Sequence, residues 1–298
     1  MGLRPHPPEL EEFATLVGSE GPVGIAGGRT HFELGGELRP GTRTVSAPVG
    51  VVTHEPAEMT VRVRAGTPVT DLEEHLADGG QMVPLDPESP ASTVGGVLAV
   101  GRSGIRRLGY GHVRDLVLEI TYVNSEGKLI RAGGPTVKNV SGFDLCRLLV
   151  GSLGTLGFIA EVVLRCHPLP EVSRWFMSGT DPVELLSGLY RPVSILWDGT
   201  ESHVLLEGAA ADVEYQADRF DLTPVAGPPE VPREGRQSVR ASQVADLQGH
   251  FVAEVGVGVV HRDIRTDPPP TEAPALHRAV KARLDPTGRL NPGREVVV

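Results

Sequence analysis

Three glycine-rich loops, each beside an apolar segment typical of a β-strand, constrain the fold of this 298-residue chain more than any other feature. They lie at residues 27–30, 91–96 and 151–157. Glycine lacks a Cβ atom, so it lets loop backbone approach a ligand or a second loop closely. Glycine and proline together supply about one residue in five, a proportion that excludes a simple helical bundle. The clusters therefore predict a turn-rich fold in which loop backbone lines a binding site.

The charge and the cysteines narrow the functional class. The net charge is −10, so the chain lacks the excess of basic residues that is typical of nucleic-acid-binding proteins. Cys146 and Cys166 form no Cys-x-x-Cys motif, so we expect two reduced, partly buried thiols and no cysteine-based metal site. Residues 1–8 show no apolar signal sequence, and the chain has no run of about 18 apolar residues. We therefore expect a cytoplasmic protein with no direct membrane span.

The apolar spacing predicts an α+β fold, with strands of period two and helices of period 3.6. Alternating valine and arginine residues at 59–65 indicate a half-buried strand, and Thr67 is the expected N-cap of the next helix. Residues 81–111 are typical of a loop. Helices are expected at 10–17, 69–76, 145–149, 182–190, 209–220 and 276–284, and strands at 23–26, 59–65, 116–122, 128–131, 158–164, 193–197, 204–206 and 251–260.

Prolines indicate a domain boundary near residue 170. Pro168 and Pro170 end the last strand pattern of the first half of the chain. The following residues have a different texture, in which short strands alternate with helical segments. We predict a first domain over residues 1–170 and a smaller α+β cap or substrate domain over residues 171–272.

The first glycine-rich loop directly follows an apolar strand and contains Gly27, Gly28, Arg29 and Thr30. Consecutive small residues let backbone N–H groups converge on an anion. The threonine hydroxyl adds a donor, and the arginine adds positive charge. The alternative is an ordinary tight turn, which is the more frequent use of glycine.

The second loop combines prolines, hydroxyl groups and glycines. Two hydroxyl residues precede two glycines, which suits close approach to a phosphate or a ring, although neither a Walker A nor a Gly-x-Gly-x-x-Gly motif is present. The arginines at positions 102, 106 and 107 are equally well explained as a solvated basic turn. The candidate residues are Pro84, Asp86, Pro87, Ser92, Thr93, Gly95, Gly96, Gly104 and Arg106.

The third region ends in a further glycine cluster. Lys138 and Asn139 are polar groups before a predicted helix, and Gly154 and Gly157 precede an apolar strand. A helix start capped by Asp144 is the alternative interpretation. Three such loops together suggest one extended phosphate-bearing ligand, such as a dinucleotide, held between two small α+β lobes.

The order and spacing of these motifs resemble the FAD-binding domain of the vanillyl-alcohol oxidase superfamily, the PCMH-type flavoproteins. Within that superfamily the chain is most similar to the GlcE-type flavin subunits of bacterial glycolate oxidase. The resemblance covers residues 22–170 and 275–298, a little over half of the chain. It rests on residues 27–30, 55–58, 65–68, 84–96, 104–107, 113–115, 138–144, 151–157 and 290–293.

This resemblance implies a PCMH-type FAD-binding domain of two α+β subdomains, with non-covalently bound FAD between them. It also implies that residues 273–298 return to this domain after the cap. The first loop would bind the pyrophosphate, and the second loop would line the phosphates and the flavin. The remaining assignments are Gly154, Gly157 and Ile159 along the adenosine, Lys138 and Asn139 near the flavin, and Asn291 closing over the site.

The chain departs from the pattern of the metal-dependent relatives. Catalytic subunits of 2-hydroxy-acid dehydrogenases in this superfamily carry a cap motif resembling His-x-Gly-Asp-Gly-Asn-x-x-His, which this sequence lacks. The cap histidines His203, His250 and His261 are scattered, so we expect structural or surface roles for them and no metal site. His31 follows the first loop without matching the register of a covalent flavin attachment. No residue is identified as the catalytic base.

The resemblance implies an FAD-dependent oxidoreductase, a glycolate oxidase-like subunit that oxidises a 2-hydroxy acid by hydride transfer to flavin. Its expected partners are the small-molecule substrate and, within a complex, a larger flavin subunit and an iron–sulfur subunit. Two alternatives remain open. One is a non-catalytic FAD-binding subunit of a multi-subunit dehydrogenase, and the other is an alditol or sugar oxidase-like flavoenzyme.

Overall fold

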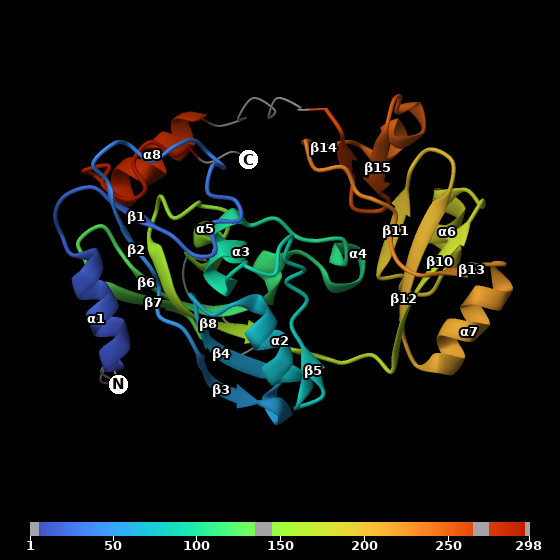
Figure 1. Ribbon diagram of the computed structural model, residues 1–298, viewed down its shortest axis with the longest axis horizontal. Helices are drawn as coiled ribbons and strands as arrows, with labels where there is room; N and C mark the ends of the chain where they lie inside the picture. Colours follow the sequence, from blue (N-terminus) through green and yellow to red (C-terminus); the bar gives the residue numbers. More distant parts are fainter. Residues whose placement is uncertain (1–5, 135–144, 265–273, 296–298) are drawn as a thin grey trace. The chain divides into compact units, whose positions relative to one another are not determined.

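The computed structural model describes residues 6–134, 145–264 and 274–295, and the chain divides into two compact units (Figure 1). The second unit begins close to the predicted boundary, but it also takes in a segment that we had assigned to the first domain. That segment joins the second unit because the N–H of Gly109 donates to the carbonyl of Val193 at 3.1 Å. The first unit comprises Met1–Gly104, His112–Pro168 and Thr271–Val298, and the second comprises Ile105–Gly111 and Leu169–Pro270.

The first unit contains an antiparallel five-stranded sheet. Its central strand, β8, is mainly apolar, and all its residues except the last are buried. The strands predicted at 116–122 and 128–131 are present and form a hairpin, whose turn is held by Asn124. Its Oδ1 accepts the N–H groups of Glu126 and Lys128 at 3.0 and 2.9 Å. The strand order is β3 (Val51–Glu55), β4 (Thr60–Arg64), β8 (Phe158–Arg165), β6 (Val117–Val123) and β7 (Leu129–Gly133).

Helices cover both faces of this sheet. α2 (Val69–Ala77), α3 (Val94–Val100) and α5 (Leu145–Leu149) contribute to the larger hydrophobic core on one face. α1 (Pro8–Val17) packs on the other face in a second core that contains Phe158. The short elements of this unit are β5 (Gln81–Met82) paired with β9 (His167–Pro168), and the 3₁₀ turns η1 (Pro56–Glu58) and η2 (Val113–Leu116).

The strand β4 is more buried than predicted, because Arg64 is buried and Arg62 is partly buried. Arg64 is 6% exposed and pairs with Glu161, and Nη1 of Arg62 lies 2.7 Å from carboxylate oxygens of both Glu119 and Glu161. Burial by itself would lower the pKa of Arg62, but hydrogen bonds to the two carboxylates and their charges raise it. The strand can bury much of its charged face because β8 and β6 of the same sheet supply the opposite charges.

The stretch after β5 is more helical than predicted. We expected a loop over residues 81–111, but α3 and α4 (Arg107–Tyr110) form there. α3 begins after Thr93, whose Oγ1 accepts the N–H of Gly96 at 3.2 Å. This cap satisfies a backbone donor at the helix start, and it stabilises a helix in a segment whose two glycines suggested a loop.

Thr67 is not the N-cap of α2, because that helix begins after Pro68. Its hydroxyl instead donates to the carbonyl of Arg64 at 2.7 Å and accepts the N–H of Gly50 at 2.9 Å. Thr67 therefore joins the end of β4 to the preceding loop.

The second unit contains an antiparallel seven-stranded sheet with α6 (Pro182–Gly188) and α7 (Ala210–Arg219) on one face. The segment 251–260, predicted as one strand, is a hairpin, because Gly256 and Gly258 adopt φ values of +81° and +78°. A 3₁₀ segment, η3 (Ala241–Asp246), precedes it. The strand order is β13 (Thr223–Val225), β10 (Val172–Ser178), β12 (Ser202–Gly208), β11 (Ser194–Trp197), β15 (Phe251–Glu254), β16 (Val259–Arg262) and β14 (Gly235–Ser238).

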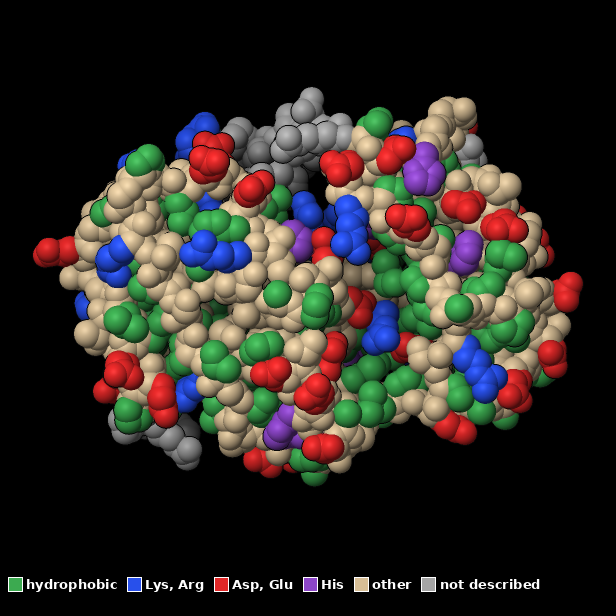
Figure 2. Space-filling view, viewed as in Figure 1, with side chains coloured by type: hydrophobic (Ala, Val, Ile, Leu, Met, Phe, Trp, Pro, Cys, Tyr) green, Lys and Arg blue, Asp and Glu red, His purple; other side chains and the backbone are tan. Residues whose placement is uncertain are grey.

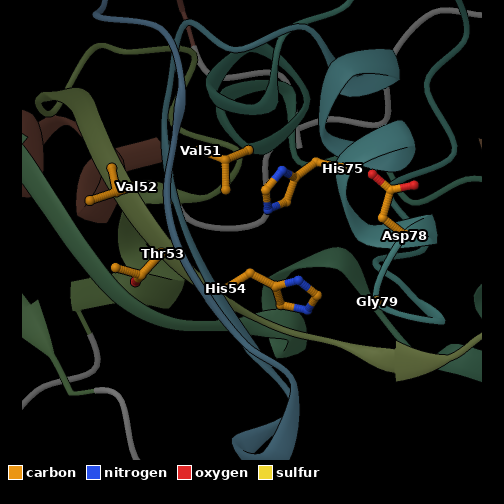
Figure 3. Close-up of a pocket in the computed structure, with 7 residues that line it drawn as sticks. All are labelled: Val51, Val52, Thr53, His54, His75, Asp78 and Gly79. Carbon is orange, nitrogen blue, oxygen red and sulfur yellow. The ribbon is translucent and has the colours of Figure 1, made fainter.

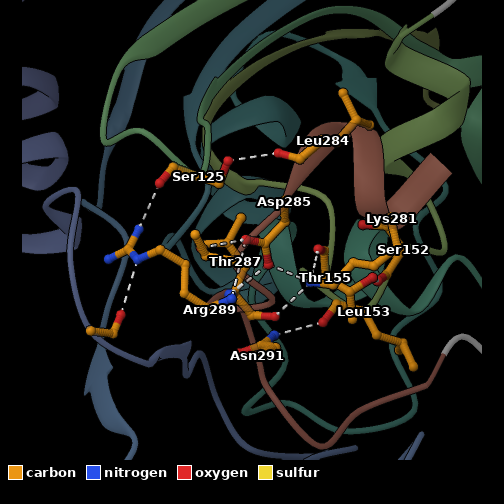
Figure 4. A network of polar contacts seen from close by, with 12 residues as sticks. Ser125, Ser152, Leu153, Thr155, Lys281, Leu284, Asp285, Thr287, Arg289 and Asn291 are labelled. Atoms are coloured by element: carbon orange, nitrogen blue, oxygen red, sulfur yellow. Dashed lines mark hydrogen bonds and ion pairs between the residues drawn. The ribbon is translucent and has the colours of Figure 1, made fainter. Parts of the chain in front are cut away.

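After α8 (Pro274–Leu284) the C-terminal segment packs into the first unit through a buried polar network (Figure 4). The Asp285 carboxylate is 1% exposed and accepts the N–H groups of Arg289 and Leu290 and the ammonium of Lys281. The Arg289 guanidinium donates to the carbonyls of Val17, Gly18, Glu20, Gly21 and Ser125 over 2.7–3.1 Å.

This network places the C-terminal segment beside the first strand of the chain. Leu290 forms a parallel bridge with Val23 of β1 (Val23–Ile25), and β1 pairs with β2 (Arg43–Val45). Segments from both ends of the described chain therefore complete the same part of the first unit.

Charged side chains are distributed over the surface. On the face shown in Figure 2, Asp and Glu side chains are spread over both units, with Lys and Arg between them. No helix in the described part of the chain is long and apolar enough to cross a membrane.

We predict that Arg289→Lys lowers the free energy of unfolding by about 2–4 kcal/mol, because an ammonium cannot reach the five carbonyls that the buried guanidinium binds. Urea denaturation followed by circular dichroism measures the change. Arg283→Lys, on the exposed side of α8, is the matched control and should leave stability within about 0.5 kcal/mol of the unsubstituted protein. Equal stability of the two variants would contradict the prediction.

Candidate functional site

The first unit contains a cavity of about 390 Å³, a volume typical of small-molecule sites. Backbone and small side chains from all three glycine-rich regions line it, together with residues of the first strands and of the C-terminal segment. The lining comprises residues 25–32, 46, 47, 49, 65, 66, 68, 91, 93, 95, 96, 99, 100, 152–154, 157–159 and 294.

The glycines of the first loop are required by contact with the second loop. A Cβ atom on Gly28 would lie 1.6 Å from the carbonyl oxygen of Ala91, and one on Gly27 would lie 2.4 Å from Oγ1 of Thr93. Arg29 adopts φ +57°, a left-handed conformation that is costly for a residue with a side chain. Close loop packing therefore leaves the backbone of residues 27–30 to form a wall of the cavity.

Asn291 joins the first strand to the third loop, and Figure 4 shows its contact with Leu153. Its side chain is buried, accepts the N–H of Ile25 at 2.9 Å and donates to the carbonyl of Leu153 at 2.6 Å. Gly154 adopts φ +69°, and a Cβ atom there would lie 2.6 Å from Nδ2 of Asn291. Asn291 thus positions lining residues without lining the cavity itself.

The cavity has an unbalanced positive charge. Arg29 and Arg294 line it, and the described lining residues include no Asp or Glu. His31, a third basic side chain of the lining, already pairs through Nε2 with Glu88 at 3.0 Å. Burial lowers the pKa of Arg294, because desolvation disfavours its charged form. Such a site favours an anionic ligand.

The structure places the predicted site residues in three groups. Gly27, Gly28, Arg29, Thr30, Thr93, Gly95, Gly96, Gly154, Gly157 and Ile159 line the cavity. Pro84, Asp86, Pro87, Ser92, Gly104 and Asn291 belong to the first unit without lining it, and Arg106 belongs to the second unit. Lys138 and Asn139 lie outside the described residues.

The residues that do not line the cavity have identifiable local contacts. The Ser92 hydroxyl lies 3.3 Å from that of Thr30, so it supports the first loop. A Cβ atom on Gly104 would lie 2.1 Å from Cβ of Asp86, so this glycine allows close packing. Nε of Arg106 lies 3.5 Å from the Glu207 carboxylate within the second unit.

Phe32, Leu153 and Arg294 also line the cavity, although they were not among the predicted site residues. Phe32 lies two residues beyond the first loop, and Leu153 lies between Gly151 and Gly154 of the third loop. Arg294 directly follows the Asn-Pro-Gly turn, and its position next to that motif was the available signal.

A second cavity, of about 420 Å³, lies beside α2 (Figure 3). His54 and His75 face each other there with ring centroids 5.7 Å apart, and Asp78 lies at its edge. Nε2 of His54 lies 2.9 Å from Oε1 of Gln81. Within the described ranges, no group of three or more His, Cys, Asp or Glu residues is arranged to hold a metal ion.

The second unit carries ionisable residues on the face of its sheet opposite α6 and α7. His203 pairs in register with Leu196, which pairs with Glu254, so these side chains share one face. Glu254 is 3% exposed and its Oε1 lies 2.7 Å from Nε2 of His261. Oε2 of Glu254 and Nδ1 of His203 are buried without a described hydrogen-bond partner. Buried polar atoms of this kind often mark a site that binds water or a ligand.

Comparison with protein families identifies the class of this fold and cavity. A model described as an FAD binding domain matches residues 8–133, and a model described as the C-terminal domain of FAD linked oxidases matches residues 234–294. In both ranges the chain is therefore similar to FAD-linked oxidoreductases, and its cofactor is FAD. A cavity with two arginines and no described carboxylate fits a cofactor that carries a diphosphate.

Several similar proteins are named as glycolate oxidase subunits or D-lactate dehydrogenases. The chain is 29% identical to glycolate oxidase subunit GlcE of Escherichia coli, over 96% of this chain and 95% of that protein. It is 37% identical to glycolate oxidase subunit GlcD of Bacillus subtilis over 40% of this chain, and 39% identical to a D-lactate dehydrogenase of Archaeoglobus fulgidus over 35%. The matched regions span about a quarter of these last two proteins.

Solved structures support the fold assignment. Two structures of alkyldihydroxyacetonephosphate synthase match 95% of this chain with TM-scores of 0.71 and 0.72 and cover 74% and 75% of those chains. Their sequence identities are 16% and 17%, so this likeness concerns the fold alone. The α+β, PCMH-type fold predicted from the sequence is confirmed.

We predict that Asn291→Asp weakens FAD binding and lowers the free energy of unfolding by about 1–3 kcal/mol, because a carboxylate cannot donate to the Leu153 carbonyl. The substitution preserves side-chain size and tolerance of a left-handed backbone, here φ +43°. Bound flavin per protein and thermal unfolding measure the two effects.

Asn124→Asp is the matched control for this prediction. Asn124 uses its side-chain oxygen to accept two N–H groups, and aspartate retains that function. It should therefore retain both flavin and stability. Equal behaviour of the two variants would remove Asn291 from its positioning role.

Proposed function

We propose that this chain is the flavin-binding subunit of a 2-hydroxy-acid dehydrogenase of the glycolate oxidase type. The observation that carries the proposal is the arginine-bearing cavity of the FAD-binding unit, together with the similarity to a GlcE subunit over nearly the full length of both proteins. The names of these relatives, glycolate oxidase subunit and D-lactate dehydrogenase, each contain a small 2-hydroxy acid. This supports the proposed substrate class.

FAD supplies a hydride acceptor when bound, and the protein holds and orients it. We assign the diphosphate to the first loop, where backbone groups of residues 27–30 and the Thr30 hydroxyl line the cavity. The flanking walls at residues 93–96 and 152–159 are assigned to the rest of the cofactor. We propose non-covalent attachment, since the His31 ring nitrogen Nε2 is already paired with Glu88.

We propose that the second unit binds the substrate and that His261 accepts the proton of the substrate hydroxyl. The buried Glu254 carboxylate holds Nε2 of His261, which leaves Nδ1 as the acceptor atom of the neutral ring. A carboxylate that orients a histidine and stabilises its charged form is a common arrangement in general base catalysis. The pair lies on the sheet face opposite the helices of this unit.

Partner subunits form part of the proposal, because the GlcE and GlcD relatives are named as subunits. We propose a larger flavin subunit and an iron–sulfur subunit as electron acceptors. A cytoplasmic location is proposed on the basis of two free buried cysteines. Burial raises the pKa of Cys166 to about 12, which keeps its thiol protonated and unreactive.

The first test is an absorption spectrum of the purified chain, followed by anaerobic additions of glycolate and D-lactate. We expect a flavin band at about 450 nm that trichloroacetic acid releases from the protein, and its bleaching by at least one hydroxy acid. If the bound flavin is bleached only after a partner subunit is added, the chain acts within a complex. A colourless protein that takes up no FAD would refute the proposed function, and bleaching by alditols alone would replace its substrate class.

The second test is His261→Gln, which we expect to lower kcat about 100-fold while the flavin content stays unchanged. Glu254→Gln should lower kcat by a smaller factor, since the ring remains held by an amide oxygen. His250→Gln is the control, because His250 is an exposed histidine of the same unit. Unchanged kcat in His261→Gln would show that another group accepts the proton.

A further inference from the structure

Two arginines from distant parts of the chain gather around one aromatic ring in the FAD cavity. The guanidinium carbon of Arg29 lies 4.8 Å from the centre of the Phe32 ring, and that of Arg294 lies 4.5 Å from the same centre. The two guanidinium carbons are therefore no more than 9.3 Å apart, the sum of these distances. All three residues line the cavity.

The chain supplies no negative charge to balance this pair. Among the described residues, neither Arg29 nor Arg294 forms an ion pair. By contrast, four other arginines pair with glutamates: Arg62, Arg64, Arg106 and Arg131. Two like charges at this separation repel each other, and the ring faces that attract them offset only part of the cost. An anion between or beside them would remove the repulsion.

The Arg294 guanidinium also lacks a hydrogen-bond partner for one of its donors. One of its Nη atoms donates to the Phe32 carbonyl at 2.6 Å, but its Nε is buried without a hydrogen-bond partner. A buried guanidinium nitrogen with an unused donor is costly in a folded protein, and a ligand that accepts a hydrogen bond from it explains why it is retained. Guanidinium groups bind phosphate oxygens with two parallel hydrogen bonds, which matches this need.

We infer that Arg29 and Arg294, held by Phe32, form a clamp for the diphosphate of the bound FAD. Arg294 comes from the C-terminal segment, and Arg29 comes from the first loop. The inference rests on the proposed function in that it takes FAD as the occupant of the cavity. It adds a binding group, Arg294, that no glycine-rich motif contains.

The clamp also couples the C-terminal segment to the cofactor. The N–H of Glu295 donates to the Gly35 carbonyl at 2.7 Å, and the N–H of Arg39 donates to the Pro292 carbonyl at 2.8 Å. The segment that carries Arg294 is thus already paired with the chain just beyond the first loop. A diphosphate held by both arginines would add a further link between the C-terminal segment and the first loop. Bound FAD should therefore order residues 291–295.

The test is a titration of apoprotein, prepared by removing the bound flavin, with FAD and separately with riboflavin, which has no phosphate. Flavin fluorescence gives each Kd at several salt concentrations. We expect Arg29→Gln and Arg294→Gln each to raise the Kd for FAD about 10- to 100-fold and to flatten its dependence on salt, because one cation is lost. Neither should change the Kd for riboflavin. Arg294→Lys should recover part of the loss, since it keeps the charge without the fork.

Arg283→Gln, on exposed α8, is the control for the change of net charge and should leave the Kd for FAD unchanged. Hydrogen exchange gives an independent readout. FAD should slow exchange at residues 291–295 in the unsubstituted protein and have a smaller effect in Arg294→Gln. Arg29→Gln keeps the test valid if Arg294→Gln fails to fold. The Arg29 side chain makes no described hydrogen bond, so its replacement should leave the fold intact.

Three results would overturn the clamp. An unchanged Kd for FAD in both variants would show that the arginines do not contact the cofactor. Equal weakening of FAD and riboflavin would indicate a general loss of the cavity rather than of a phosphate contact. An unchanged Kd for FAD together with a raised KM for glycolate would assign the arginines to the substrate carboxylate. Failure of the unsubstituted protein to bind FAD would instead refute the proposed function itself.

Discussion

The hydrogen bonds of the Asn291 side chain hold together the loops on which the cavity of the first unit depends. Asn291 bonds to Ile25 and Leu153, so one buried amide connects the first strand to the third loop. Its own position depends on Asp285, which accepts backbone N–H groups just before it, and on Arg289, whose guanidinium binds the carbonyl of Val17. The shape of the cavity is therefore determined by contacts between segments more than 100 residues apart in the sequence.

Arginines occupy two different electrostatic environments in the first unit. In β4, Arg64 is buried and Arg62 is partly buried, and both pair with glutamates from other strands of the sheet, so their charges stabilise the sheet internally. In the cavity, Arg29 and Arg294 have an aromatic ring for a neighbour and no described carboxylate. The first pair is structural, and the second is arranged for a ligand that brings its own negative charge.

Local sequence patterns were sufficient where a residue acts within its own segment. The loop at residues 27–30, the glycines at 95 and 96, and the strand at 158–164 were predicted because small residues beside an apolar strand carry a local signal. α3 was missed because a threonine cap outweighs two unfavourable glycines. The buried face of β4 was missed because its charge partners lie on other strands, about 60 and 100 residues away.

By itself the sequence predicted the fold class and the loops that line the cavity, because apolar periodicity and glycine clusters are local properties, and the order of its motifs carried the resemblance that implied FAD. The tertiary structure alone decided which side chains share a space. It brought Arg294 to Phe32, Asn291 to Leu153 and Glu254 to His261. The first two of these contacts join segments far apart in the chain, and the third depends on strand register. Such pairings arise from packing of the whole unit, which no window of sequence contains.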